Sequence, residues 1–140
     1  MSFVVDASVI FAWQFPDEES EIVDHVAEML IERVAWVPAH WHAEIANGFA
    51  IAVRRNRLTR EYREGALKRI SDLPIRTDHD STLALWNETQ VLCDEYQLSA
   101  YDAAYLELAR RRRIPLATLD NAMIRAASAL GISLVDKSSS

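Results

Sequence analysis

Short, mostly apolar stretches alternate with longer amphipathic stretches along this chain. The short stretches hold three or four residues each, as buried strands do, and lie at residues 3–5, 35–37, 75–77, 115–118 and 132–135. Between them apolar side chains recur at helical spacing, as Ile22, Val26 and Met29 do. Strands that alternate with helices are typical of parallel sheets. We therefore predict a three-layer α/β domain, with a parallel sheet of four to five strands and helices on both faces.

Two of the predicted helices are specific enough to test. A long helix is expected over residues 39–55, with an apolar stripe that includes Trp41 and Ile45. A second helix, capped by Asp80 or Ser81, is expected to bury one face. The side chains of that face are Leu83, Trp86, Cys93 and Tyr96.

Length and composition fit one globular domain with its own core. The chain has 140 residues, of which 50% are hydrophobic and 26% charged. We expect the domain over residues 1–135 and a disordered tail over residues 136–140. The single cysteine excludes an internal disulfide and a cysteine-rich zinc site, and it fits a cytoplasmic protein. We also expect no signal peptide and no membrane span.

Four acidic side chains stand where this fold would gather them. Asp6 and Asp120 directly follow predicted strands, and the carboxyl ends of parallel strands share one edge of the sheet. Asp102 lies in the first turn of a predicted helix, and Glu44 lies inside the long helix. Each has an ordinary explanation alone, as a helix cap, an acid favoured by the helix dipole or a solvated side chain. Together they predict one acidic pocket.

A divalent cation would relieve the repulsion among these carboxylates. Mg²⁺ and Mn²⁺ prefer oxygen ligands, and such ions assist the hydrolysis of phosphodiesters. The net charge of −6 argues against nucleic-acid binding by bulk charge, but not against an enzyme that uses a metal. The predicted metal ligands and catalytic residues are Asp6, Glu44, Asp102 and Asp120. Around them, Ser8, Asn47 and Thr118 are expected to orient waters or carboxylates.

Other chemistries fit this sequence less well. His42 and Glu44 have the spacing of a zinc deaminase, but that site also needs paired cysteines. There is no H-E-x-x-H pattern, no Gly-rich phosphate loop and no G-x-S-x-G elbow. The four histidines are given no catalytic part. Two basic runs, at residues 54–57 and 110–113, either complement helix C-termini or hold a phosphate backbone, and both interpretations stay open.

A resemblance to the PIN domain, and within it to the VapC ribonuclease toxins, rests on four segments. They are VVDAS at residues 4–8, EIAN at 44–47, YDAAY at 101–105 and ATLD at 117–120. The resemblance places the family's acidic quartet on Asp6, Glu44, Asp102 and Asp120, with its hydroxyl residue at Thr118 and its asparagine at Asn47. It implies a sheet with the first strand central, Mg²⁺- or Mn²⁺-dependent cleavage of RNA, a homodimer and a VapB-like antitoxin.

Two other classes of protein remain as alternatives. A phosphotransfer protein also has a strand-end Asp beside other acids, but it needs a nearby Lys. The chain has only Lys68 and Lys137, and neither follows a strand near the acids. A non-catalytic module that binds RNA or protein has no need for clustered carboxylates, which repel one another. The metal-dependent ribonuclease is therefore the leading hypothesis.

Overall fold

A single parallel sheet organises the molecule. The computed structural model describes residues 1–18 and 20–136. Within them lie four strands, β1 (Phe3–Val5), β2 (Ala35–Pro38), β3 (Ile75–Asp78) and β4 (Leu116–Ala117). All pairings are parallel, and the strand order is β3-β2-β1-β4. The predicted fold class is confirmed, and β1 lies between two neighbours as expected. Most of the predicted tail, residues 137–140, lies outside the described residues.

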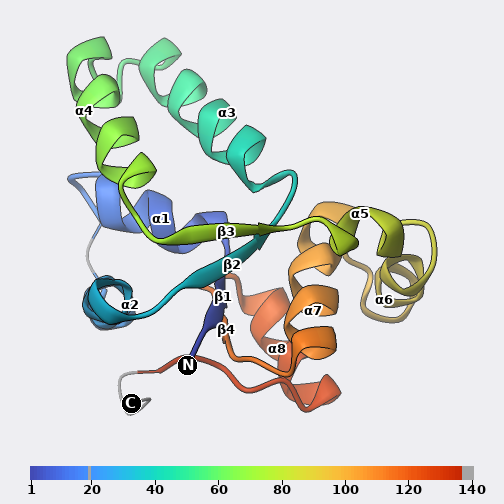
Figure 1. Ribbon diagram of the computed structural model, residues 1–140. Helices are drawn as coiled ribbons and strands as arrows, with labels where there is room; N and C mark the ends of the chain where they lie inside the picture. Colours follow the sequence, from blue (N-terminus) through green and yellow to red (C-terminus); the bar gives the residue numbers. More distant parts are fainter. Residues whose placement is uncertain (19, 137–140) are drawn as a thin grey trace.

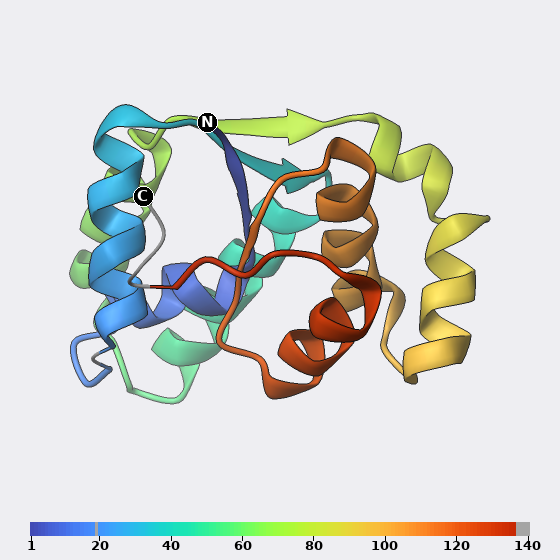
Figure 2. The same ribbon diagram turned by 90° about the horizontal axis from the view of Figure 1, so that it is seen from below.

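Helices flank the sheet on both sides (Figure 1). They are α1 (Ala7–Gln14), α2 (Glu21–Glu32), α3 (Trp41–Arg54), α4 (Arg60–Ser71), α5 (Asp80–Ala84), α6 (Glu88–Tyr96), α7 (Ala100–Arg112) and α8 (Asn121–Leu130). Figures 1 and 2 show α1 and α2 on one side of the sheet, with α7 and α8 on the other. Among the described helices, none has the length and apolar character that crossing a membrane requires.

The close approach of α3 to α1 depends on a glycine. An ideal Cβ built on Gly48 would lie 2.2 Å from the ring of Phe11 in α1. The absence of a side chain at Gly48 therefore lets the Phe11 ring lie directly against the α3 backbone. Phe11 also stacks on Phe15, with ring centroids 5.4 Å apart. This packing fixes α3 beside the start of α1, where β1 ends.

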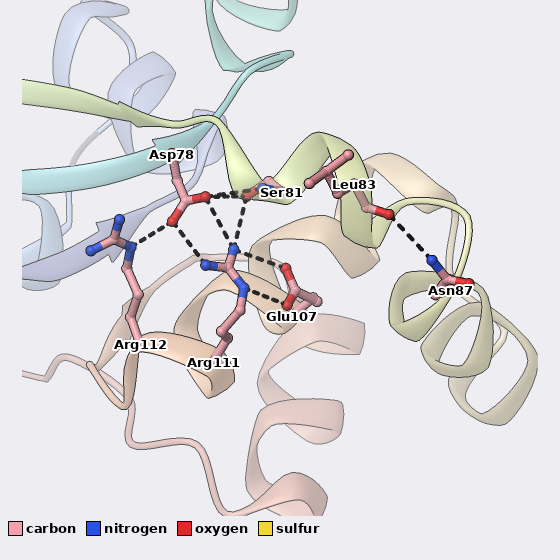
Figure 3. Close-up of polar contacts among 7 residues, drawn as sticks. All are labelled: Asp78, Ser81, Leu83, Asn87, Glu107, Arg111 and Arg112. Atoms are coloured by element: carbon pink, nitrogen blue, oxygen red, sulfur yellow. Dashed lines mark hydrogen bonds and ion pairs between the residues drawn. The ribbon is translucent and has the colours of Figure 1, made fainter.

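A buried ion cluster fixes α7 against the end of β3 (Figure 3). The Arg111 guanidinium donates to both oxygens of Asp78, at 3.1 Å each, and to both oxygens of Glu107, at 2.8 and 3.2 Å. Arg112 donates its Nε to Asp78 at 2.5 Å, and its guanidinium lies 3.6 Å from the centroid of the Trp36 ring. Asp78 is only 1% exposed. Arg111 and Arg112 therefore have structural partners inside the protein.

Two predictions about the elements are wrong. Residues 132–135 do not form a strand and contribute only one bridge, from Leu134 to Leu116. The buried face predicted for the helix after Asp80 is also wrong in part. Its first two residues are not buried, since Leu83 is 74% exposed and Trp86 is 88% exposed. The cause is a break at residues 85–87, where the chain leaves α5 before α6 begins. The helical spacing therefore does not continue from Leu83 to Cys93.

Candidate active site

One pocket at the carboxyl edge of the sheet holds all four predicted acids. Its volume is about 200 Å³, and it is also lined by Ser8, Phe11 and Tyr105. The acids that line it are Asp6, Glu44, Asp102 and Asp120. Asp6 and Asp120 follow the neighbouring strands β1 and β4 as the N-caps of α1 and α8, while Glu44 and Asp102 lie in α3 and α7. We call this cavity the acidic pocket.

Asp6 accepts the most hydrogen bonds of the four. It is the N-cap of α1, and its Oδ1 accepts hydrogen bonds from the Ser8 amide at 2.9 Å and the Ser8 hydroxyl at 2.5 Å. The Thr118 hydroxyl donates to its other oxygen at 2.5 Å. Burial raises the pKa of the Asp6 carboxyl to about 6, although these hydrogen bonds act to lower it. Asp6 therefore both caps α1 and lines the acidic pocket.

The Ser8 and Thr118 hydroxyls join the two strand ends. Thr118 Oγ1 accepts from the Asp120 amide at 3.1 Å, and Ser8 Oγ accepts from the Leu119 amide at 3.1 Å. Each hydroxyl thus donates to Asp6 and accepts from the loop that carries Asp120. Within the described part of the chain, the side-chain amide of Asn47 makes no hydrogen bond. Asn47 lines a hollow next to the pocket instead. The arrangement fixes Asp6 and Asp120 relative to each other.

Two residues beside Glu44 escaped the sequence reasoning. The Tyr105 hydroxyl donates to Glu44 Oε1 at 2.7 Å. His40 Nε2 lies 2.9 Å from the same oxygen, in a contact that does not meet the geometry of a hydrogen bond. The other oxygen, Oε2, receives neither contact. From the sequence, the histidines were expected to have no catalytic part, and the position of His40 beside Glu44 was not foreseen.

Simple signals existed for both residues. His40 follows the end of β2, the strand next to β1, and precedes Glu44 by four positions. Tyr105 lies one helical turn after Asp102, on the same face of α7. Burial and then the charge of Glu44 raise the pKa of the Tyr105 phenol, so this group stays a donor.

The charges in the pocket disfavour one another. Burial raises the pKa of Asp102, and the nearby carboxylates of Asp120 and Glu44 raise it further. A group whose neighbours oppose its ionised form gains most from a cation, which removes that repulsion. The ionised form of Asp102 is therefore disfavoured by its surroundings in this metal-free state.

The donor set fits a hydrated divalent cation. Within residues 1–18 and 20–136, no group of three or more His, Cys, Asp or Glu side chains is placed so that it could hold a metal ion. Mg²⁺ does not require three protein ligands, because it usually keeps several waters and takes one or two carboxylates. A pocket of about 200 Å³ lined by four carboxylates offers those ligands and room for waters. The residues present are therefore compatible with Mg²⁺ or Mn²⁺.

Three arginines of the basic runs lie in structural contacts. Besides Arg111 and Arg112, Arg57 donates to Asp17 at 2.9 Å and to Glu18 at 3.0 Å. Its guanidinium also lies over the Phe15 ring, 4.4 Å from the centroid. For these arginines the structural interpretation of the basic runs is the one that the contacts favour.

Comparisons with known proteins agree with this architecture. The family model for the PIN domain matches residues 3–129. The solved structure of PAE2754 from Pyrobaculum aerophilum is similar, with 19% identity, a TM-score of 0.69, and coverage of 99% of this chain and 93% of that one. FitAcB from Neisseria gonorrhoeae is similar too, with 17% identity, a TM-score of 0.65 and coverage of 98% of both chains. At such identities the two structures support the fold alone. No curated protein matches the sequence significantly.

Proposed function

This chain belongs to the PIN domain family, and from that premise we propose that it is a Mg²⁺- or Mn²⁺-dependent endoribonuclease. PIN domains are generally nucleases. The observation that carries the proposal is the acidic pocket, in which four carboxylates from β1, α3, α7 and the end of β4 line one small cavity. A protein that only binds RNA gains nothing from such a concentration of negative charge.

We assign the metal to Asp6, Glu44, Asp102 and Asp120. When bound there, a divalent cation would lower the pKa of a coordinated water and neutralise charge on the leaving oxygen. Ser8 and Thr118 orient the Asp6 carboxylate through its two oxygens. Tyr105 holds Glu44 by Oε1 and so directs the remaining oxygen toward other partners. Phe11 provides an apolar wall to the same cavity.

The biological role that we propose is that of a toxin in a VapBC-type toxin–antitoxin pair. The support is the resemblance of the four sequence segments to VapC, together with the family membership. This role implies a homodimer in the cytoplasm that cleaves cellular RNA and is neutralised by a VapB-like antitoxin. Induced expression in a bacterial host should then arrest growth, and Asp102→Asn should relieve the arrest.

The decisive experiment is cleavage of total cellular RNA by the purified, partner-free protein. The assay compares Mn²⁺ with chelator, and the unmodified protein with Asp102→Asn. Asp94→Asn, which changes an exposed acid on α6, is the matched control. We expect discrete fragments only with metal, and only from the unmodified protein and the control. Fragments that persist with chelator or in Asp102→Asn would refute this mechanism.

The absence of fragments would favour the non-catalytic binding module instead. A metal-binding measurement separates that module from a nuclease of narrow specificity. If the acids share one ion, Mn²⁺ raises the melting temperature by mass action. A protein that neither cleaves RNA nor responds to Mn²⁺ would have an acidic pocket without catalytic function.

A further inference from the structure

We propose that a second hollow, next to the acidic pocket, receives one unpaired nucleobase of the RNA strand that is cut. This proposal rests on the nuclease function proposed above and names the part of the substrate that the neighbouring surface would bind. The hollow has a volume of about 510 Å³, within the range of about 300–1,000 Å³ of small-molecule sites. We call it the base hollow. The residues that define it are His40, Glu44, Asn47, Ser99, Tyr101 and Asp102.

The base hollow adjoins the acidic pocket. Glu44 and Asp102 line both cavities, so these two residues lie at the boundary between them. A phosphodiester held at the acidic pocket would place an adjoining nucleotide on one side of that boundary. The base hollow is therefore within reach of the same substrate molecule.

Tyr101 supplies a stacking surface. Tyr101 is 65% exposed and takes no part in the hydrophobic core, whereas Tyr105, one turn later on α7, is 1% exposed. His40 packs against Tyr101 with ring centroids 5.5 Å apart and an interplanar angle of 66°. This contact fixes one part of the ring and leaves most of it open. Exposed aromatic rings beside a nucleic-acid site bind single-stranded bases by stacking.

Asn47 and Ser99 supply polar groups that can recognise the edge of a base. The side-chain amide of Asn47 offers a donor and an acceptor, and it makes no hydrogen bond within the described part of the chain. The Ser99 hydroxyl accepts from the Asp102 backbone amide at 3.1 Å and also hydrogen-bonds the Asp102 carboxylate, so it is a polar group shared with Asp102. The pattern of edge groups on a base would decide how well it fits.

The charge of the base hollow selects a base rather than a phosphate. It contains the carboxylates of Glu44 and Asp102, and no Lys or Arg lines it. A phosphate would be repelled there, whereas a neutral aromatic ring with polar edges would not. The hollow also requires an unstacked base, because the bases of a duplex are stacked and paired with each other. The structure thus favours single-stranded RNA as the substrate class.

The test measures RNA binding without cleavage. Fluorescein-labelled single-stranded 12-mers of oligo(A), oligo(U) and oligo(C) are titrated with the full chain in Ca²⁺, which also takes oxygen ligands and replaces Mn²⁺ in this binding assay, and fluorescence anisotropy gives Kd. Tyr101→Ala should raise Kd by roughly tenfold, the usual contribution of one stacked base. Tyr101→Phe, which retains the ring, should stay within about twofold. Because Tyr101 is exposed, both variants should keep the melting temperature of the parent.

Abasic probes locate the contact. In the tightest-binding 12-mer, each base is removed in turn, and one position should lose about as much affinity as Tyr101→Ala does. On the probe that lacks this base, Tyr101→Ala should cause no further loss of affinity, as in a double-mutant cycle. Three results would overturn the proposal. Tyr101→Ala could lose the same affinity on every abasic probe, it could bind the probes as the parent does, or the parent could bind no probe at all.

The two proposals fail in different ways. If the protein binds the probes through Tyr101 but cleaves no RNA with Mn²⁺, the base hollow stands and the nuclease function falls. If it cleaves RNA and Tyr101→Ala changes neither Kd nor KM, the nuclease function stands and the base hollow falls. Equal binding of a duplex and of a single strand would exclude an unpaired base as the ligand.

Discussion

Replacing Arg111 by Met removes the cation that holds two buried carboxylates together. Asp78 is 1% exposed and Glu107 is 3% exposed, and both are bound by the Arg111 guanidinium. Burial alone would raise the pKa of Asp78, but hydrogen bonds from Arg111 and Arg112 hold it at about 2. The Met side chain keeps the apolar stem of Arg111 and removes only its charge and donors.

The expected loss of stability follows from these contacts. Holding the pKa of Asp78 at about 2 instead of 3.8 corresponds to roughly 2 kcal/mol of stabilisation. Removing one partner of a buried ion pair typically costs about 3–5 kcal/mol. Arg112 still binds Asp78 in the variant, and the Arg111 side chain is partly exposed, so the lower end applies. We expect Arg111→Met to lower the free energy of unfolding by about 3 kcal/mol.

Urea unfolding in chelator, near neutral pH, measures this loss. Arg110→Met is the matched control, because Arg110 is an exposed neighbour on the same helical turn, and it should cost less than about 0.5 kcal/mol. Asp78 has a native pKa below its unfolded value, so its stabilising effect is present above about pH 4 and is lost as the pH falls toward 2. The difference between Arg111→Met and the parent should therefore shrink below about pH 4.

The double variant Asp78→Asn/Arg111→Met distinguishes a pair from two separate effects. Neutralising Asp78 removes part of the unpaired buried charge, so the double variant should be more stable than Arg111→Met alone. A loss in Arg111→Met no larger than that in Arg110→Met would refute this account of the ion cluster. A loss that is independent of pH would refute its electrostatic basis.

Three further predictions concern the site and its support. Asp6→Asn should raise the free energy of unfolding of the metal-free protein by about 1–3 kcal/mol at neutral pH, because burial holds the pKa of Asp6 at about 6 against 3.8. The gain should fade between about pH 6 and pH 4 in urea unfolding, as the native Asp6 takes up its proton. Mn²⁺ should raise the melting temperature of the parent, and Asp102→Asn should reduce that shift; an equal shift in both would count against a shared ion. Gly48→Ala should lower stability by about 1–3 kcal/mol, because its Cβ would press on the Phe11 ring. Gly65→Ala is the control and should not lower stability, because the added Cβ meets only the flexible end of Arg69 at 3.2 Å. Equal losses of stability at the two glycines would contradict the packing argument.

The local pattern of apolar residues was sufficient to predict the elements that are defined by their own sequence. The apolar segment at residues 3–5 becomes β1, and the long helix becomes α3, because burial and helical spacing are properties of neighbouring residues. The expectation that Asp6 and Asp120 meet at one edge was also correct, since parallel strands carry their carboxyl ends to the same side. Where a turn interrupts the pattern, the prediction failed, as at Leu83 and Trp86.

Only the tertiary structure decided which strand-end acid joins the pocket. Asp78 ends β3 in the same way that Asp6 and Asp120 follow β1 and β4. The strand order β3-β2-β1-β4 puts β1 beside β4 and β3 at the far edge, so Asp78 meets Arg111 instead of the other acids. Sequence fixes which residues end strands, but the order of strands depends on long-range packing, which no local pattern specifies. The same packing brings Tyr105, which is 61 residues away in the chain, to the Glu44 oxygen that the neighbouring His40 also approaches.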